Sequence, residues 1–413
     1  MIRMTPQRLC VVARVAPVWL CIACGDVPQQ NTPPEPRTLQ DQISLPPGFH
    51  IEVWADNLVR PRSLALGDSG TVFVGTYLFT KGVTSPIYAL RDTDNDQKAD
   101  RVWEIRNNFG TPNGIDFHDG TLYVVDEHRV LRLPNIEASL DNPTFEEIYR
   151  DLPSRASTDS ATNVGHWWRY LVYGPDDKLY ITVGTRWSIL AGAHSANDID
   201  DDPQYSTIVR MNPDGTDFEI FADGVRNSVG LAFHPTSDEL WFTDNGPSWP
   251  FEDSRFYDIP PDELNRAAAP GLHFGFPYVH GNLPDWVSGS SVPAGTIAPA
   301  HEFLAHSATL GLEFYTGSAF PLEYHNQIFV AEHGTEATTP APLEKLHGDR
   351  LSVIKLDNAG NVLSYEVFAD GFRLGSNRDY TRRPVDLLVM PDGSLLVSDD
   401  QAWVIYRIWY DGG

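Results

Sequence analysis

The sequence predicts an all-β chain that folds as one six-bladed β-propeller. Pairs of short apolar strands recur with a period of roughly 50 residues, which is typical of propeller blades. The turns within the pairs are rich in Asp-Gly and Pro-Asp-Gly, which favour β-hairpins. Segments with helical periodicity are nearly absent from the 413 residues. A propeller accommodates this length in one domain because it adds blades around an axis instead of enlarging one core.

Each strand pair marks the inner half of one predicted blade. Both strands of a pair are apolar, as expected for strands that are buried between neighbouring blades. The second strand often ends in an acidic residue. The six pairs lie at residues 64–74, 115–126, 171–181, 231–244, 312–330 and 387–399.

A second repeat predicts the outer strands and the closure of the ring. Residues 51–56, 218–223 and 365–370 share an alternating apolar and acidic pattern that ends in Ala-Asp. Each copy stands just before an inner pair, where the outer strand of the preceding blade belongs. The copy at 51–56 precedes the first blade, so we expect this N-terminal strand to complete the last blade and hide the free sheet edges.

The first 23 residues are interpreted as an export signal. Arg3, Arg8 and Arg14 precede an apolar run that is too short to span a bilayer as a stable helix. Cys24 stands where a lipoprotein carries its lipid-modified cysteine, and ordinary secretion is the alternative. We therefore expect a periplasmic or cell-envelope lipoprotein, attached to a membrane only through lipid on Cys24.

The remaining chain divides into a tether and one domain. Residues 24–47 are rich in Pro, Gln and Asn, which predicts a flexible tether, and residues 48–413 form the predicted propeller domain. All three cysteines, Cys10, Cys21 and Cys24, lie at or before the start of this tether. The propeller therefore contains no disulfide and no cysteine-ligated metal.

The charge balance excludes some partners. The chain has 56 acidic and 30 basic residues, for a net charge of −26. This charge repels nucleic acid and anionic lipid, so we expect neither as a partner.

The repeat register gathers cationic side chains at one mouth of the central channel. Such a cluster in an acidic protein predicts an anionic ligand, because unpaired cations are costly to bring together; the alternative is that each arginine pairs with a neighbouring acid. His166 is the histidine of this ring and a candidate proton acceptor, with a structural role as the alternative. The residues four or five places before the inner strands are Arg60, Thr111, His166 with Trp167, Arg226 with Asn227, Ser307, and Arg382 with Arg383.

An acidic loop predicts a separate Ca²⁺ site on the blade rim. Asp92, Asp94, Asp96 and Asp100 occupy positions 1, 3, 5 and 9 of a Ca²⁺-binding pattern, although Gln97 replaces the usual glycine. The alternative is a solvated turn.

Three further residues are candidates near the channel mouth. Asp262 and Glu263 are another option for Ca²⁺ and are equally able to anchor loops. Trp168 suits stacking against a sugar ring, although tryptophans in propellers also pack between blades.

Several segments resemble the soluble quinoprotein glucose/sorbosone dehydrogenase family. These are propellers that oxidise sugars with pyrroloquinoline quinone (PQQ). The likeness covers roughly residues 45–410 and is nearer to the sorbosone branch. The matching segments are GVRNSVGLAF at 224–233, DNGP at 244–247, DELN at 262–265 and GFPY at 275–278.

The resemblance implies a role for each matching residue. His166 would take the hydroxyl proton of the sugar as hydride moves to the quinone. Arg226, Asn227 and Arg383 would hold the cofactor. The backbone carbonyls at Gly246 and Pro247 would bind Ca²⁺, and Asn113 would contact the substrate.

Two positions depart from the family pattern. Thr185 stands where the glucose enzymes carry an acid that orients the catalytic histidine. No lysine matches the family's quinone-binding lysine, which leaves His333 to face the quinone.

The function expected on this basis is PQQ-dependent oxidation of an aldose or a sugar aldehyde. Electrons would pass to a separate acceptor, a cytochrome or the quinone pool. The alternatives are a Ca²⁺-dependent lactonase-like hydrolase and a non-catalytic propeller that binds carbohydrate or protein. The basic ring argues against the hydrolase, because that class holds its channel metal with Glu, Asn and Asp side chains.

Overall fold

A computed structural model describes most of the chain after residue 37. The predictions for the export signal and for Cys24 lie outside the described residues. No described helix is long and apolar enough to cross a membrane. The described residues are 38–77, 84–153, 166–185, 204–247, 254, 257–282, 292–335, 342–373 and 381–412.

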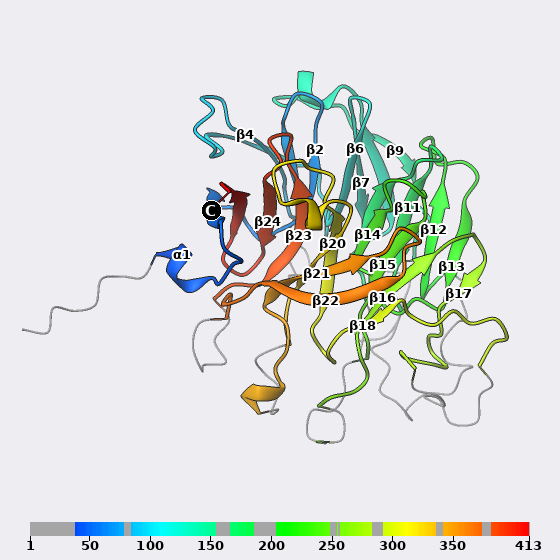
Figure 1. The fold of residues 1–413 in the computed structure, drawn as a ribbon. Helices are drawn as coiled ribbons and strands as arrows, with labels where there is room; N and C mark the ends of the chain where they lie inside the picture. The colour runs from blue at the N-terminus through cyan, green and yellow to red at the C-terminus, as the bar shows by residue number, and fades with distance from the viewer. Residues whose placement is uncertain are drawn as a thin grey trace, which may run out of the picture. The chain divides into compact units, whose positions relative to one another are not determined.

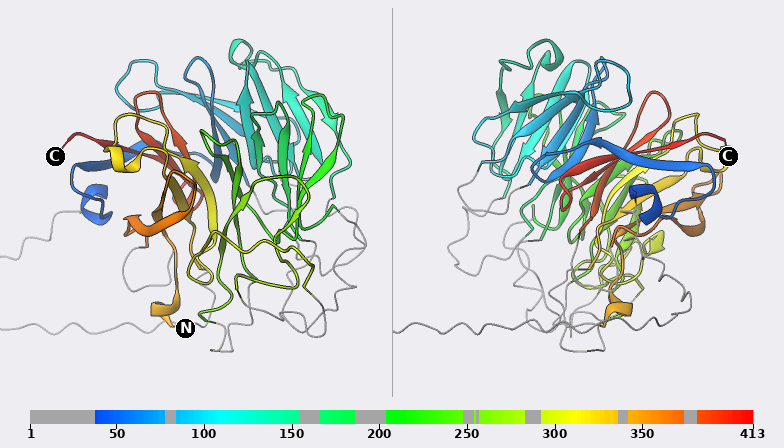
Figure 2. Two further views of the ribbon diagram at one scale, coloured as in Figure 1. Left: turned by 45° about the vertical axis from the view of Figure 1, so that its right-hand side comes forward. Right: turned by 90° about the vertical axis from the view of Figure 1, so that its left-hand side faces the viewer.

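The described strands form six antiparallel blades of a β-propeller, as predicted (Figures 1 and 2). The first blade contains β2 (Pro61–Leu66), β3 (Val72–Thr76), β4 (Ile87–Arg91) and β5 (Arg101–Ile105). The second contains β6 (Gly114–His118), β7 (Thr121–Asp126), β8 (Arg129–Leu133) and β9 (Glu146–Tyr149). The third contains β10 (Leu171–Tyr173), β11 (Leu179–Val183), β12 (Thr207–Met211) and β13 (Glu219–Asp223), with β17 (Leu272–His273) added in parallel to β13.

The other three blades repeat this plan. The fourth contains β14 (Gly230–Phe233), β15 (Leu240–Asp244), β16 (Glu263–Ala267) and β18 (His301–Glu302). The fifth contains β19 (Thr309–Phe314), β20 (Ile328–Glu332), β21 (Arg350–Leu356) and β22 (Val362–Ala369). The sixth contains β23 (Pro384–Val389), β24 (Leu395–Asp399), β25 (Val404–Tyr410) and, as its outer strand, β1 (Phe49–Ala55).

The pairing of β1 with β25 confirms that the N-terminal strand closes the ring. The two strands run antiparallel, with Phe49 opposite Tyr410, and lie side by side as the blue and red strands of Figure 2. Phe49 is buried, and its ring meets those of Phe320 and Phe368 edge-on, with centroids 4.7 and 5.0 Å away. The fifth blade is therefore tied to the sixth blade through one aromatic cluster.

Replacing Phe49 with alanine is expected to lower the free energy of unfolding by about 3–5 kcal/mol, as for other buried aromatic residues. The cavity left behind lies where β1 pairs with β25, so the substitution weakens the closure of the ring. Urea unfolding followed by tryptophan fluorescence measures the change. The neighbouring His50→Ala variant is the control, because the side chain of His50 is 36% exposed. Equal stability of both variants would contradict this role of the strand.

The predicted tether is too long at its C-terminal end. Residues 38–47 pack on the domain: the short helix α1 (Leu39–Gln42) leads into Ile43, which is buried in the aromatic cluster just described. Ser44 exchanges two backbone hydrogen bonds with Asp370, at 2.7 and 3.0 Å. The apolar side chain of Ile43 packs into this hydrophobic cluster. The Pro-rich composition of the region did not predict this contact.

The innermost strands of all six blades surround a channel on the propeller axis. Residues of β2, β6, β10, β14, β19 and β23 line it together. The apolar faces of each blade pack against the next; in one such cluster Phe73 and Ala89 of the first blade meet Ile115 and Val124 of the second. The loops that enter the innermost strands therefore converge on the axis, as the repeat register predicts.

Candidate functional site

A cavity of about 410 Å³ lies where the loops entering the innermost strands converge. The structure brings together there most of the predicted ring and cofactor residues, which come from blades that are distant in the sequence. Thr111, Ser307, Trp167 and Arg382 do not line it. The basic and imidazole side chains of its wall are Arg60, Arg62, Arg226, Arg383, His166, His306 and His333, and Trp168 and Asn227 join them.

The imidazole of His166 has both ring nitrogens buried, with no hydrogen-bond partner among the described residues. Its backbone N–H donates to the carbonyl of Thr185 at 3.1 Å, and its ring stands edge-on to that of Trp168, with centroids 5.5 Å apart. Burial, with Arg226 and Arg169 nearby, holds the pKa of His166 well below its usual value. The ring is therefore neutral at pH 7 and able to accept a proton.

Arg226 is buried, and its guanidinium forms no ion pair with any described acid. Its Nη1 donates to the backbone carbonyls of Asn245 and Gly246, both at 2.9 Å. Its Nε and Nη2 are buried without a partner among the described residues. The nearby carboxylate of Asp244 accepts instead from the backbone N–H groups of Arg226 (2.8 Å) and Asn227 (2.6 Å). Burial lowers the pKa of Arg226 to about 10, so it keeps its charge.

Two residues of the wall, Arg62 and Asp400, were missed by sequence reasoning. Arg62 Nη1 and Asp400 Oδ2 form a buried ion pair at 2.6 Å. Asp400 Oδ1 meets His333 Nε2 at 2.9 Å, and Arg383 Nε donates to the backbone carbonyl of His333, also at 2.9 Å. Arg62 stands two residues after the predicted Arg60. Side chains two residues apart in an extended segment lie on the same face, and this spacing could have indicated Arg62.

Asn113, predicted to contact substrate, lies behind the cavity wall. It is 1% exposed and is absent from the cavity lining. Its Oδ1 accepts from Arg62 Nε at 2.7 Å, and its Nδ2 donates to the carbonyl of Arg169 at 2.6 Å. Gly75 permits this close packing, because a Cβ there would collide with the Asn113 carbonyl. Asn113 therefore positions Arg62 and does not reach the ligand space.

The predicted carbonyl site for Ca²⁺ carries a competing hydrogen bond. Gly246 lines the cavity, but its carbonyl accepts from Arg226, whose charge opposes a cation there. Asp262 Oδ1 accepts from Gly246 N (2.8 Å) and Oδ2 from Ala308 N (2.6 Å), so this carboxylate anchors two loops. Burial raises its pKa to about 7. Pro247 does not line the cavity.

Glu263 also serves as an anchor. Its Oε1 accepts from Gly281 N at 2.6 Å and its Oε2 from Asn265 Nδ2 at 2.9 Å. Glu263 does not line the cavity. The loop-anchor interpretation thus describes Glu263 and Asp262 better than Ca²⁺ ligation.

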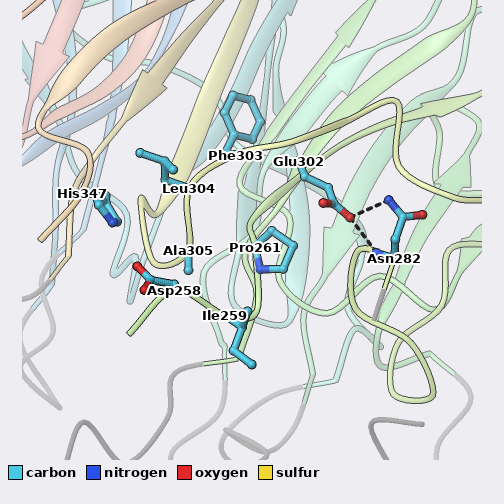
Figure 3. Close-up of a pocket in the computed structure, with 9 residues that line it drawn as sticks. All are labelled: Asp258, Ile259, Pro261, Asn282, Glu302, Phe303, Leu304, Ala305 and His347. Carbon is cyan, nitrogen blue, oxygen red and sulfur yellow. Dashed lines mark hydrogen bonds between the residues drawn. The ribbon is translucent and has the colours of Figure 1, made fainter. Parts of the chain in front are cut away.

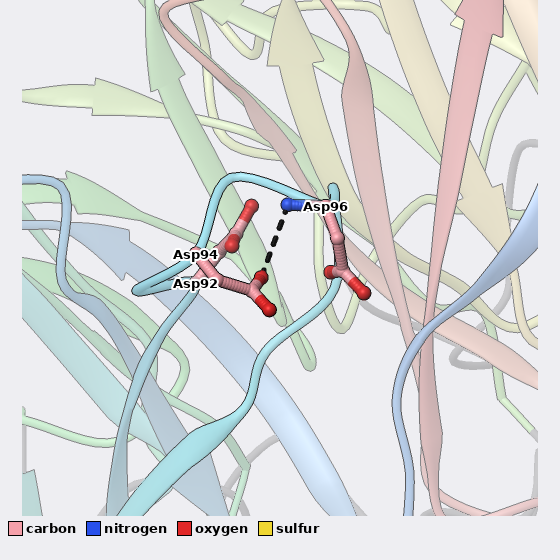
Figure 4. A group of neighbouring side chains, drawn as sticks. All are labelled: Asp92, Asp94 and Asp96. Atoms are coloured by element: carbon pink, nitrogen blue, oxygen red, sulfur yellow. Dashed lines mark hydrogen bonds between the residues drawn. The ribbon is translucent and has the colours of Figure 1, made fainter.

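The acidic loop lies apart from the cavity, between β4 and β5. Asp92, Asp94 and Asp96, which Figure 4 draws on this loop, each offer an oxygen within 4.8 Å of the others. Asp100 instead accepts from Thr93 N at 3.0 Å and Thr93 Oγ1 at 2.6 Å, closing the base of the loop. The cluster is exposed, and Ca²⁺ binding by these residues stays a prediction.

A smaller pocket of about 270 Å³ lies beside the cavity (Figure 3). Glu302 accepts there from Asn282 N (2.6 Å) and Nδ2 (2.8 Å), and Phe303, Leu304 and Ala305 supply apolar surface. The strand entrance at 303–308 separates this pocket from the cavity, since Ala305 lines one and His306 the other.

Three carboxyl groups interact within the channel. Glu313 lies near Asp386 and Asp116, and Tyr170 Oη donates to Asp386 at 3.0 Å. Burial, and then the neighbouring acids, raise the pKa of Glu313 to about 8; burial raises those of Asp386 and Asp116 to about 7 and 6. A carboxyl group with a raised pKa loses its contribution to stability as the pH climbs toward that value.

Glu313→Gln is therefore expected to stabilise the protein in alkaline solution. The unfolding free energy of the wild type should fall between about pH 5 and pH 8, and the variant should lose less. Near pH 8.5 the variant should melt about 2 °C higher, which for a large domain corresponds to roughly 1 kcal/mol. Thermal unfolding at several pH values measures this, with the exposed Glu344→Gln as control. A lower midpoint for Glu313→Gln at pH 8.5 would contradict the repulsion among these acids.

The fold and cavity define a six-bladed propeller with a basic, imidazole-bearing ligand cavity on its axis. The chain belongs to the Glucose / Sorbosone dehydrogenase family, whose model matches residues 123–345. It is 30% identical over 384 residues to an uncharacterized protein of Borreliella burgdorferi, covering 89% of this chain and 91% of that protein. It is 25% identical over 281 residues to the aldose sugar dehydrogenase YliI of Escherichia coli, covering 62% of each.

Solved structures share the fold. The holo form of the pyranose dehydrogenase PQQ domain from Coprinopsis cinerea aligns with a TM-score of 0.69 and 14% identity, covering 91% of this chain and 98% of that one. The PQQ-bound aldose sugar dehydrogenase of Streptomyces coelicolor aligns with a TM-score of 0.57 and 18% identity, covering 89% and 100%. The sorbosone branch stays a prediction.

Proposed function

We propose that this protein is a quinoprotein that oxidises an aldose or a sugar aldehyde with PQQ. The observation that carries the proposal is a set of buried hydrogen-bonding atoms at the cavity that find no partner among the described residues: Arg226 Nε and Nη2, Asn227 Oδ1 and both ring nitrogens of His166. Buried polar atoms are rarely left unpaired in folded proteins, so these atoms indicate a ligand. Family membership and the names of the relatives support a sugar dehydrogenase.

The residues present fit an anionic quinone. PQQ is a planar tricarboxylate with two adjacent quinone oxygens, and Arg226, Arg383 and Arg60 line one cavity. Arginine forks suit planar carboxylate and quinone acceptors. When bound, PQQ supplies a two-electron acceptor, and that redox chemistry belongs to the cofactor. Arg226, Asn227 and Arg383 would hold its oxygens.

His166 would accept the hydroxyl proton of the sugar. Its neutral ring lines the cavity, and neither ring nitrogen bonds a described residue. Trp168 beside it offers an aromatic face for a sugar ring. The carboxylate partner found in many catalytic histidines is absent among the described residues, so Arg169 and Thr185 hold the backbone instead: Arg169 Nη1 donates to the carbonyl of His166 at 3.1 Å. The base is therefore placed by main-chain contacts.

Ca²⁺ is the less well supported part of the proposal. The donor set at Gly246 does not fit a cation alone, because the same carbonyl accepts from Arg226. We expect Ca²⁺ to bind there only together with the anionic cofactor, whose carboxylates would balance the arginine charge.

The hydrolase alternative is less well supported than oxidation. Within the described residues, the only group of three acidic or imidazole side chains close enough to share a metal is Asp92, Asp94 and Asp96, outside the cavity. A lactonase-like site requires such ligands in the channel. A binding propeller without activity is separated from the enzyme by the reconstitution below.

The cellular setting is a separate proposal that rests on the sequence alone. The export signal supports a periplasmic or cell-envelope protein with lipid on Cys24. Electrons from the sugar would leave to a separate acceptor, a cytochrome or the quinone pool. Cell fractionation of a Cys24→Ser variant tests the anchor: release of the variant from the membrane fraction is expected.

Reconstitution tests the function. Purified protein is mixed with PQQ, with and without Ca²⁺, and the quinone absorbance is followed as a panel of aldoses is added. We expect saturable PQQ binding and bleaching of the quinone band by at least one sugar. PQQ that stays free in equilibrium dialysis would overturn the proposal, and PQQ that binds without being reduced by any sugar would favour a binding propeller.

A further inference from the structure

Asp400 fixes the protonation pattern of His333. The carboxylate is 4% exposed, receives Arg62 Nη1 on Oδ2 at 2.6 Å, and faces His333 Nε2 through Oδ1 at 2.9 Å. Arg62 and His333 lower the pKa of Asp400 despite its burial, so it is ionised. An ionised carboxylate only accepts hydrogen bonds. Nε2 of His333 therefore carries a hydrogen.

The other nitrogen of the ring, Nδ1, carries a lone pair. The charged groups that face His333 are Arg383, Arg62 and Asp400. The positive charges of the two arginines oppose protonation of the His333 ring. Burial, and then Arg383, lower the pKa of His333 to about 4, and Asp400 only partly offsets them. The ring is neutral at pH 7. No described residue donates a hydrogen bond to Nδ1, and His333 lines the cavity.

We propose that His333 accepts a hydrogen bond from a hydroxyl group of the sugar through Nδ1, with Asp400 as the residue that positions it. This inference rests on the proposed function and specifies how that site selects its substrate. The oxygens of a carboxylate or a quinone are acceptors, so an imidazole that presents an acceptor cannot hold them. The predicted role of His333 in cofactor binding is therefore replaced by one in substrate recognition.

The first test measures the protonation state of the His333 ring in protein without cofactor. Long-range ¹H–¹⁵N NMR distinguishes the two neutral tautomers and the imidazolium. We expect His333 to show a protonated Nε2 and a bare Nδ1 at pH 7, and to lose this preference in Asp400→Asn. A protonated Nδ1 at pH 7 in the wild type would overturn the inference, whatever PQQ does.

The second test separates substrate from cofactor binding. His333→Gln keeps a donor near the position of Nε2, toward Asp400, and removes the Nδ1 acceptor. We expect KM for the sugar to rise about 10-fold, the typical effect of losing one hydrogen bond to a hydroxyl, while PQQ affinity is unchanged. His325→Gln is the matched control, because His325 Nε2 contacts the carbonyl of Phe320 away from the cavity.

The outcomes are distinct. Weaker PQQ binding in His333→Gln, with KM unchanged, would return His333 to the cofactor and overturn the inference. Wild-type protein that binds no PQQ at all would overturn the proposed function, and the NMR tautomer would still decide whether His333 presents an acceptor. Circular dichroism of each variant establishes that the fold is intact.

Discussion

Replacing His166 with asparagine is expected to lower kcat for sugar oxidation by about 10²–10⁴-fold, the usual contribution of a general base. The amide cannot take a proton, whereas the imidazole is neutral and its nitrogens have no hydrogen-bond partner in the part of the chain that the structure describes. PQQ affinity should change little, because the cofactor is held by the arginines. Dye-linked oxidation in PQQ-loaded protein measures kcat, and equilibrium dialysis measures cofactor binding.

The pH profile adds an independent reading of the same residue. Because burial holds the pKa of His166 well below its usual value, kcat/KM should stay constant through the pH range in which an ordinary histidine titrates and decline only in more acidic solution. The His166→Asn variant should not show this decline of kcat/KM in acidic solution. His234→Asn is the control, since His234 bonds Thr236 in an exposed turn. Unchanged oxidation in His166→Asn would end its assignment as the base.

Replacing Arg226 with lysine is expected to weaken PQQ binding by about 10²–10³-fold, within the range found when one partner of a buried charged contact is removed. Lysine retains the positive charge but lacks the planar guanidinium with its several N–H donors. It cannot both donate to the carbonyls of Asn245 and Gly246 and present two further N–H groups to a ligand. Isothermal titration with PQQ measures the change.

A matched substitution separates the cofactor from general stability. Arg129→Lys alters an arginine that pairs with Asp126 outside the cavity, so it should bind PQQ as the wild type does. If Arg226→Lys retained wild-type affinity and folded normally, the unpartnered nitrogens of Arg226 would not be ligand contacts. The proposal would then lose the observation that carries it.

The sequence placed the loops of the site more reliably than it assigned the role of each side chain. Counting back from the inner strands located Arg226, His166 and Arg383 at one mouth, and the structure gathers them around one cavity. The same reasoning misplaced Asn113, which bonds Arg62 behind the wall. It missed Asp400, because a residue just after a strand gives no local sign of the two blades it will bridge.

By itself the sequence determined the propeller, its six blades and the closing strand. Hairpin turns and alternating apolar strands are local patterns, and their period repeats along the chain. Only the tertiary structure decided which polar atoms meet. Asp400 holds Arg62 across an interval of 338 residues, and such pairing depends on how the blades close around the axis. Likewise, only the fold showed that Arg226 and His166 keep buried nitrogens for which the described part of the chain offers no partner.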